Sequence, residues 1–444
     1  MSTVSTRGVL RRASFYLAFA SAAVILVSIA ASQILLGLAL LALLVGGGPI
    51  RFPPIRLPLA CFFLITLVAA LASGDPLGAM PQIKKFFVFA IVLVIYSTFD
   101  GLPQARALVF AWAGIASLSA ALGIVQFVER WQEAVKEHAN NYDFFLYARI
   151  TGFASHWMTF GGEEMIVLLV LASFLLFSNH SKFKLLGWPM LALLLAAVTL
   201  GMTRSVFLLG VPLGLGYLLW SRRRVLLVAA VAIGAIGIAA SPRAIQERAL
   251  SAVRPHGEDS NTHRAICRAV GWEMVKAHPW LGLGPEQVRK QFNRYIPASV
   301  PRPLPVGWYG HLHNIYLQYA AERGIFGLLA ILWLIAKVMR DFTVFLRTGA
   351  PSLEVRAILH GGIAMILGVL AEGFFEYNLG DSEVLTLFLS AIACGYVAIR
   401  QAPAAAVPVM AVSSAAACSS MSGAPREWCC KAPRRSWNVF VPSC

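Results

Sequence analysis

The chain has 444 residues, of which 58% are hydrophobic and 13% are charged. A soluble domain carries roughly 25% charged residues, so this composition excludes an ordinary soluble enzyme and indicates a polytopic membrane protein. The net charge of +16 would suggest nucleic acid as a partner of a soluble chain, but in a membrane protein it is better explained by cytoplasmic anchoring charges and a basic site.

Apolar runs alternate with short polar loops over most of the chain. The run Ala13–Gly48 has no clear signal-peptide cleavage site and is long enough for two short spans, because one span needs about 20 residues. Further spans are predicted at 58–73, 83–99, 105–128, 163–179, 185–203, 205–220, 225–240, 313–337, 356–377 and 381–399. The sequence therefore predicts an all-α protein with about twelve transmembrane helices.

Basic residues in the short loops predict the orientation of these spans, since cytoplasmic loops are enriched in lysine and arginine. If the amino terminus is cytoplasmic, the inner loops carry Arg51, Arg56, Arg106, Lys182, Lys184, Arg222, Arg223, Arg224, Lys337, Arg340, Arg347 and Arg400. Lys84 and Lys85 then lie on the outer side, against the rule. This orientation places the long loop 241–312, the turn at Arg204 and His313 on the same external side.

The same pattern divides the chain into four parts. They are 1–240 with nine spans and short loops, 241–312 as an external loop, 313–400 with three spans, and 401–444 as a tail. The tail is rich in Ala, Pro and Ser before it turns to Cys, Trp and Arg, and it shows no periodicity, so we expect a disordered cytoplasmic tail.

Arg204 is the first candidate for chemistry, because it lies between two apolar runs in Leu200-Gly-Met-Thr-Arg-Ser-Val-Phe207. A charge at membrane depth is costly and is usually paired or functional. The alternative is an interfacial arginine that extends from a helix end to the membrane surface. Its predicted position on the same side as His313 favours function.

The external loop carries ten basic residues against five acidic ones. Asn261–Ala277 is predicted to be an amphipathic helix with Ile266, Val270 and Met274 on one stripe, and the segment Pro279–Pro285 ends it. Arginine binds phosphate in a bidentate manner, so the excess suits a multiply charged phosphate ligand. Arg264 and Arg289 are our candidates, although most of the ten could equally form a solvated basic surface.

His313 stands where this polar loop ends and a long apolar helix begins. An imidazole at such a boundary can exchange protons near neutral pH, which makes His313 a candidate base, and a capping role is the alternative. His311 and His313 could form a metal pair, but no third ligand is evident in the sequence, so no metal is expected. We expect the two histidines to point to different sides, and Asn314 to cap the helix.

The same helix carries four further residues with predicted structural roles. Glu322 and Arg323 lie roughly 14 Å beyond His313 along a helix, so we expect them to pair with each other rather than to touch substrate. Gly324 and Gly327 are expected to allow close contact between helices.

Together these segments resemble the shared domain of bacterial O-antigen ligases and O-antigen polymerases, to which protein O-oligosaccharyltransferases are related. The elements are Thr203-Arg204-Ser205, Asn261-x-x-Arg264 with Trp272, His278-Pro279-Trp280-x-Gly282-x-Gly284, His313-Asn314-x-Tyr316-Leu317, and Glu322-x-Gly324-x-x-Gly327. Upstream, Arg149-Ile-Thr-Gly152-Phe153 resembles another element of the family. The resemblance is close over about 200–330 and looser over 1–400.

The resemblance implies a GT-C-like, multi-pass glycosyltransferase of the bacterial inner membrane with its active site facing the periplasm. Such proteins transfer a glycan from undecaprenyl pyrophosphate, and neither a metal nor another cofactor is expected. By the same resemblance His313 would be the catalytic base, and Arg204, Arg264, Arg289 and Arg149 would bind substrate. The partners would be undecaprenyl-pyrophosphate-linked O-antigen, lipid A–core and membrane lipids, with no nucleic acid.

Ligase and polymerase share this donor and differ in the acceptor. The basic external loop favours a phosphorylated lipid A–core acceptor, so an inverting, metal-independent O-antigen ligase is our first expectation. An O-antigen polymerase or a protein O-oligosaccharyltransferase is the alternative within the family. A transporter of lipid-linked glycan is the alternative outside it, and the absence of an evident repeat of spans argues against a transporter.

Overall fold

The computed structural model describes residues 6–138, 149–179, 181–241, 243–250, 260–305, 307 and 309–401. Within these ranges the regular elements are all helices, so the predicted all-α class is confirmed. Apart from Gln401, the predicted tail lies outside the described residues.

The first part of the chain forms helices that mostly follow the apolar runs. They are α1 (Thr6–Val24), α2 (Ile29–Val45), α3 (Arg56–Ala72), α4 (Met80–Lys84), η1 (Lys85–Phe89), α5 (Ala90–Thr98), α6 (Leu102–Lys136), α8 (Trp157–Phe177), α9 (Ser181–Leu200), η2 (Ser205–Gly210), α10 (Val211–Arg222) and α11 (Arg224–Ala239).

The second part contains the segment 241–312, called the external segment after its predicted side, and the last long helices. They are α12 (Arg243–Leu250), α13 (Ser260–Ala277), α14 (Gln287–Gln291), η3 (Phe292–Tyr295), α15 (Ile315–Thr348), α16 (Leu353–Glu372), η4 (Asn378–Gly380) and α17 (Ser382–Gln401). The predicted amphipathic helix over 261–277 is confirmed as α13, with Ile266, Val270 and Met274 buried.

The described helices are those of a multi-pass membrane protein. Seven helical segments are long and apolar enough to cross a membrane, and α2, α3 and α11 are shorter apolar helices. With α1 and α15, these segments coincide with the spans expected from the sequence. Two are longer than expected, because α6 continues to Lys136 and α15 continues to Thr348.

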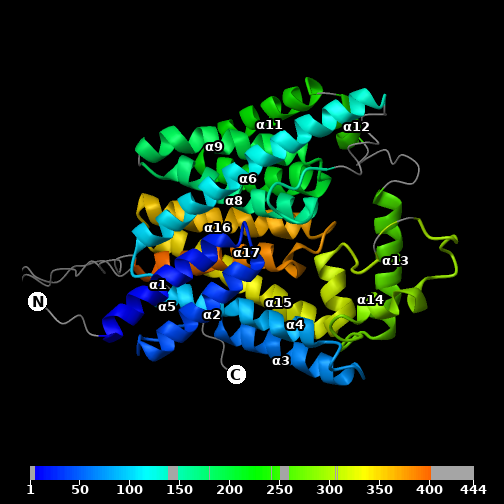
Figure 1. The fold of residues 1–444 in the computed structure, drawn as a ribbon, viewed down its shortest axis with the longest axis horizontal. Coiled ribbons are helices and arrows are strands. Elements are labelled where there is room, and N and C mark those ends of the chain that lie inside the picture. The colour runs from blue at the N-terminus through cyan, green and yellow to red at the C-terminus, as the bar shows by residue number, and fades with distance from the viewer. Residues whose placement is uncertain are drawn as a thin grey trace, which may run out of the picture. The chain divides into compact units, whose positions relative to one another are not determined.

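The helix α8 lies at the centre of the packed core (Figure 1). Every residue from Thr159 to Leu175 is buried, and α6, α9, α10, α16 and α17 pack around it. A helix that is apolar on nearly all sides is stable when it is enclosed in this way or when it spans a membrane. By contrast, α11 is equally apolar but buries no residue, which is the pattern of a helix that faces lipid.

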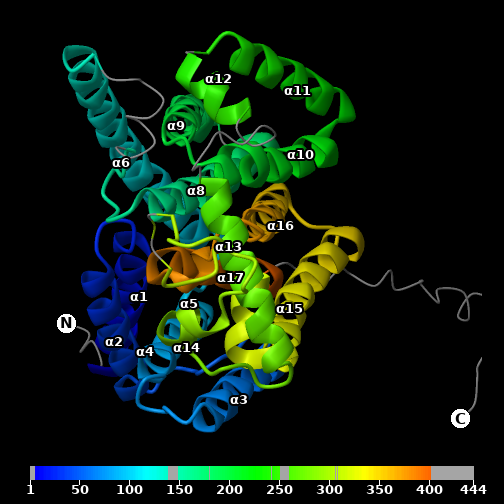
Figure 2. The ribbon, with the colours of Figure 1, turned by 90° about the vertical axis from the view of Figure 1, so that its right-hand side faces the viewer.

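The helices of the external segment lie across one end of the long helices, where Figure 1 shows α13 and α14 together. Viewed from that end in Figure 2, α13 crosses in front of the bundle. It packs on α15 through a small core of its own that includes Val270, Met274 and Leu312. This arrangement holds the polar face of α13 close to the start of α15.

A break in α15 ties the segment 279–286 to the bundle. Gly324 adopts φ 65° and ψ −173°, which interrupts the helix, and the amide of Gly284 donates to the carbonyl of Glu322 at 2.9 Å. A Cβ on Gly324 would meet the backbone oxygen of Trp280 at 1.9 Å, so only glycine fits there. The expected close contact at Gly324 therefore exists, but its partner is a loop backbone rather than a helix.

Glu322 and Arg323 pair with each other, as expected. Arg323 Nη1 lies 2.6 Å from Glu322 Oε2, and its other nitrogens donate to Thr66 Oγ1 at 3.1 Å and to Gln82 Oε1 at 3.2 Å. Gln82 in turn donates to Glu286 at 2.6 Å. Since a buried ion pair needs such hydrogen bonds to offset its desolvation, we interpret this network as a structural link between α3, α4 and the external segment.

Candidate functional site

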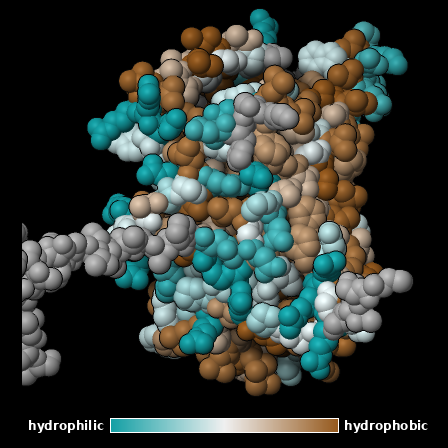
Figure 3. All heavy atoms as spheres, turned by 90° about the vertical axis from the view of Figure 1, so that its left-hand side faces the viewer, coloured by the Kyte–Doolittle hydropathy of each residue, from teal (hydrophilic) through white to brown (hydrophobic). Residues whose placement is uncertain are grey.

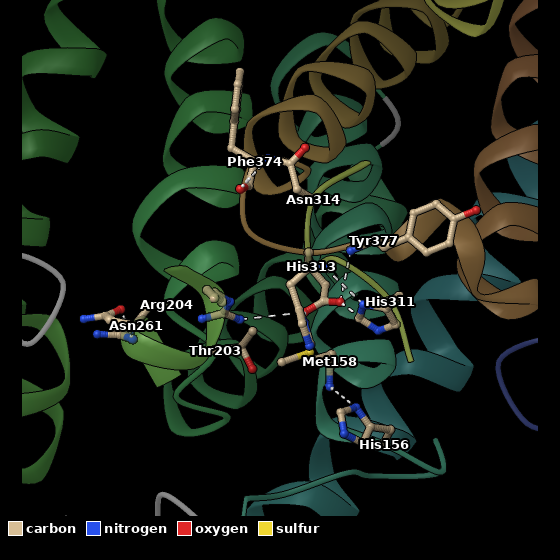
Figure 4. Close-up of polar contacts among 12 residues, drawn as sticks. His156, Met158, Thr203, Arg204, Asn261, His311, His313, Asn314, Phe374 and Tyr377 are labelled. Atoms are coloured by element: carbon tan, nitrogen blue, oxygen red, sulfur yellow. Dashed lines mark hydrogen bonds and ion pairs between the residues drawn. The ribbon is translucent and has the colours of Figure 1, made fainter. Parts of the chain in front are cut away.

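The chain turns sharply at His313 just before α15 begins (Figure 4). His313 has a φ of 48°, in the left-handed region that only a few non-glycine residues occupy. Asn314 is the N-cap of α15, and its Oδ1 accepts a hydrogen bond from the amide of Leu317 at 2.8 Å. The capping role predicted for Asn314 is confirmed, so the His313 side chain is not needed to cap this helix.

The loop after α16 brings a carboxylate to His313. The carbonyl of Gly373 accepts from the amide of Ile315 at 2.7 Å, and the carbonyl of Phe374 accepts from Asn314 Nδ2 at 3.0 Å. These two bonds fasten the loop to the start of α15. As a result Glu376 Oε2 lies 3.0 Å from His313 Nδ1. Sequence reasoning missed Glu376, which is separated from His313 along the chain by two long helices, α15 and α16.

The charge of Glu376 fixes the tautomer of His313. Burial opposes ionisation of the carboxyl, but the neighbouring His313, His311 and Arg264 outweigh it and hold the pKa of Glu376 below its ordinary range. The ionised carboxylate can only accept hydrogen bonds, so neutral His313 carries its proton on Nδ1. The Nε2 atom is then the basic one, and it has no hydrogen-bond partner among the described residues.

His311 belongs to the same cluster, contrary to the expectation that it would point away. Its Nε2 lies 3.6 Å from Glu376 Oε1, and its ring centroid lies 4.1 Å from that of His313. The left-handed turn at His313 brings both rings to the same carboxylate. Burial lowers the pKa of His311 to about 4, with Glu376 opposing the shift, so His311 is neutral at pH 7.

Arg264 of α13 contacts the cluster directly, and Arg204 is joined to α13 through Asn261. Arg264 Nη2 lies 3.7 Å from Glu376 Oε2, and one helical turn earlier Asn261 Oδ1 accepts from Arg204 Nη2 at 2.7 Å. Both arginines are buried. The motif residues from the turn after α9, from α13 and from the start of α15 therefore meet at one site, as Figure 4 shows for Arg204, Asn261 and His313.

Arg149 lies at another side of this site, just before α8. Its guanidinium stacks over the ring of Trp157 at 5.0 Å, and the side chain is buried. The neighbouring His156 caps α8 by accepting from the Met158 amide at 3.2 Å. Burial lowers the pKa of His156, Glu376 opposes this shift and Arg149 adds to it, so the groups are close enough to act on one another.

Arg289 is not brought to the cluster. It lies exposed on α14, and within the described part of the chain it makes no hydrogen bond or ion pair with His313, Glu376 or Arg264. The adjacent Lys290 pairs with Asp75. The structure therefore places Arg264 in the cluster and Arg289 outside it, although the sequence suggested both.

A metal could in principle bind at the same histidines. The ligand atoms of His311, His313 and Glu376 lie within 4.8 Å of one another, so Glu376 supplies the third ligand that the sequence did not reveal. However, the Arg264 guanidinium lies 3.7 Å from the same carboxylate and would repel a cation. Since Glu376 also holds His313 Nδ1, we interpret the cluster as a carboxylate–imidazole pair.

The region of the chain that carries most of this site matches a known family. Residues 167–332 match the family model described as O-antigen ligase. The match includes Arg204, Arg264 and His313, while Glu376 lies outside it. No curated protein matches the chain.

Proposed function

Because this chain belongs to the O-antigen ligase and polymerase superfamily through residues 167–332, we propose that it transfers O-antigen from undecaprenyl pyrophosphate to lipid A–core in the periplasm of a bacterium. The observation that carries the proposal is the buried cluster of His313, Glu376 and Arg264, with Arg204 joined to it through Asn261. It combines one oriented base with two arginines. A displacement at a sugar pyrophosphate requires these two kinds of group.

In the proposed reaction, a hydroxyl of the acceptor attacks the anomeric carbon of the donor glycan. The new bond is between that oxygen and the anomeric carbon, and the bond to the pyrophosphate oxygen breaks with inversion. His313 Nε2 takes the proton of the attacking hydroxyl, and undecaprenyl pyrophosphate leaves with the bonding electrons. Because the donor is already activated, neither ATP nor a nucleotide sugar is required.

Glu376 orients the base in this mechanism. Its Oε2 lies 3.0 Å from His313 Nδ1 and accepts the proton there in a hydrogen bond, which leaves the lone pair on Nε2 for the substrate and stabilises the imidazolium that forms. Nε2 is shielded in the described structure, and the ring of His263 lies edge-on to His313 with centroids 5.1 Å apart. We therefore infer that side chains around Nε2 shift when the acceptor enters.

Arg204 and Arg264 bind the pyrophosphate and neutralise the charge that grows on it as the donor bond breaks. A planar guanidinium can hold two phosphate oxygens at once, and both side chains are already ordered by Asn261 and Glu376. Arg149 is a third candidate for substrate binding, and it lies close enough to His156 to lower the pKa of that histidine. We leave Arg289 out of the mechanism because of its separate, exposed position.

The proposed acceptor is lipid A–core, because the basic external segment suits a phosphorylated acceptor. A polymerase would use a second lipid-linked glycan instead, and a protein O-oligosaccharyltransferase would use a polypeptide. These reactions share the donor chemistry at His313, so an experiment has to vary the acceptor.

Purified protein should therefore be incubated with undecaprenyl-pyrophosphate-linked O-antigen in the presence of a chelator and without ATP. Separate reactions would contain rough lipopolysaccharide, no further acceptor, or an acceptor protein. We expect smooth lipopolysaccharide in the first reaction alone. Lengthening of the lipid-linked glycan without lipopolysaccharide would identify a polymerase, and a glycosylated protein would identify a protein transferase. Transport of the donor with no covalent product in any reaction would refute a transferase.

A further inference from the structure

A cavity with charged and apolar walls lies at the far end of α15 from His313. It has a volume of about 350 Å³. The residues that line it are Pro54, Tyr96, Lys337, Arg340, Asp341, Val344, Phe345, Thr348, Tyr396, Ile399 and Arg400. They come from α15, α17, the helix α5 and the loop before α3, so the cavity is built between helices rather than on one of them.

The cavity and the candidate active site lie at opposite ends of α15, so we assign them to opposite membrane surfaces. Lys337 follows the start of α15 by 22 residues, or roughly 33 Å at 1.5 Å per residue, and the hydrocarbon core of a bilayer is about 30 Å thick. Figure 3 views the end of the bundle away from α13, where hydrophilic residues gather between apolar flanks. A ligand in this cavity therefore would not compete with substrates at His313.

The cavity has an excess of positive charge. The one acidic residue of its lining, Asp341, is neutralised by Lys337 Nζ at 2.6 Å and accepts from the Tyr396 hydroxyl at 2.8 Å. The other two cations of the lining, Arg340 and Arg400, make no ion pair with any described residue. Arg340 is exposed and makes no hydrogen bond or ion pair with any described residue, whereas Arg400 donates to the carbonyls of Tyr96 and Phe99.

Arg400 is held rigidly, since its guanidinium also lies 4.6 Å from the centre of the Tyr96 ring. Its Nε has no hydrogen-bond partner among the described residues. The fixed guanidinium of Arg400 and the adaptable guanidinium of Arg340 thus line the same cavity. Guanidinium groups placed together in this way bind phosphate oxygens with charge-assisted hydrogen bonds.

The rest of the lining is apolar, and part of it faces outward. Val344 is 46% exposed, and Pro54, Phe345 and Ile399 continue the apolar wall beside the arginines. Such a surface suits an amphiphile with an anionic head, because its acyl chain can lie along the helices while its phosphate meets the cations. Basic pockets between transmembrane helices are known to bind anionic lipid head groups in this manner.

We propose that this cavity is a binding site for the phosphodiester head group of an anionic membrane phospholipid, held by Arg340 and Arg400 in the leaflet opposite the candidate active site. The site is independent of the glycan transfer proposed above. A free phosphate ion would use the same arginines without the apolar wall, so the lipid and the ion can be separated experimentally.

The test is native mass spectrometry of the full chain released from detergent, titrated with phosphatidylglycerol. The variant Arg340→Gln removes the adaptable cation, and it should fold because this side chain is exposed. Arg356→Gln is the matched control, since Arg356 is an exposed arginine at the same end of the long helices but does not line the cavity. We expect Arg340→Gln to weaken the binding of the first phosphatidylglycerol about tenfold, and Arg356→Gln to leave it nearly unchanged.

Two further measurements decide between the lipid and other ligands. Phosphatidylcholine should bind more weakly than phosphatidylglycerol and should be insensitive to Arg340→Gln. Val344→Trp, which obstructs the apolar wall, should weaken phosphatidylglycerol binding without changing the stability of the protein. Equal losses in Arg340→Gln and Arg356→Gln would overturn the site, because general attraction to anionic lipid would then explain binding. Soluble glycerol phosphate binding as tightly as the lipid would overturn the lipid as its ligand.

Discussion

Replacing Glu376 with glutamine tests whether the carboxylate and His313 act as one unit. The substitution keeps the size of the side chain but removes the charge that holds the proton on His313 Nδ1. If the amide NH2 faces Nδ1, the imidazole proton moves to Nε2 and the base is lost. We expect kcat to fall by about 10²–10⁴, the usual contribution of a general base, with a much smaller change in donor binding.

The structure also predicts a cost in folding stability. Glu376 is 3% exposed and lies beside the buried Arg264, so its neutralisation removes a charge that faces this guanidinium. Breaking a buried ion pair typically costs about 3–5 kcal/mol, a large part of the stability of an average protein. Glu376→Asp keeps the charge on a side chain one methylene shorter, so it should recover most of the stability and part of the rate.

The assay compares His313→Ala, Glu376→Gln and the double variant in one reconstituted preparation. Transfer rate, donor binding and thermal stability are measured for each. Because Glu376 assists the proton transfer through His313, the double variant should be as slow as His313→Ala in kcat, within about a factor of two. A double variant slower by the product of the two single losses would show that Glu376 acts separately. A folded Glu376→Gln variant with normal kcat would refute its role altogether.

Three other predictions concern charge, topology and pH. Arg204→Lys keeps the charge but loses the planar fork, so transfer should fall at least about tenfold while the protein still inserts. In a cysteine-free background, Ala265→Cys on α13 should react with a membrane-impermeant maleimide in intact spheroplasts, whereas Arg347→Cys should react only after lysis. His311 has a pKa of about 4 in the folded protein against 6.5 as its ordinary value, so the unfolded chain binds more protons between these pH values. Folding stability should therefore fall as pH drops through this window, by at most about 3 kcal/mol, and His311→Gln should reduce this dependence in thermal melts.

Each of these predictions has a control and a contradicting result. Arg289→Lys should keep near-normal activity. Equal losses of transfer activity in Arg204→Lys and Arg289→Lys would mean that Arg204 does not bind the donor pyrophosphate in a specific bidentate manner. Labelling of Ala265→Cys only after lysis would invert the topology and remove the periplasmic site. His278→Gln changes an exposed histidine and is the control for His311→Gln. If His311→Gln leaves the dependence of folding stability on pH unaltered, the burial argument for His311 is contradicted.

The helical fold could be predicted because its signals are local. Apolar runs of sufficient length marked the membrane helices, and the stripe of Ile266, Val270 and Met274 marked the buried face of α13. The cap at Asn314 was equally predictable, since a short polar side chain before an apolar run has few other roles there.

The glycines of the segment 279–286 and of α15 illustrate what a motif can and cannot reveal. Gly282, Gly284 and Gly324 were evident as a pattern, but the sequence could not show that they face one another. In the structure all three have positive φ, and their backbones meet where α15 is interrupted. Such contacts depend on how distant segments pack, which no single stretch of sequence encodes.

The missing part of the site was Glu376, together with the orientation of His311. A signal for Glu376 did exist, since an acidic residue at the end of an apolar span, on the same predicted side as His313, is a candidate partner. Its pairing could not be predicted because it depends on hydrogen bonds between the loop 373–381 and the start of α15. The left-handed turn at His313, which redirects His311, has no signature in the sequence either.

The most direct test of His313 as the base is transfer to rough lipopolysaccharide by wild type and His313→Ala, with binding of undecaprenyl-pyrophosphate-linked O-antigen measured on the same samples. We predict that His313→Ala folds and binds the donor through the arginines, but forms product at least about 10²-fold more slowly than wild type. A folded, donor-binding variant that transfers at more than about a tenth of the normal rate would show that His313 is not the base.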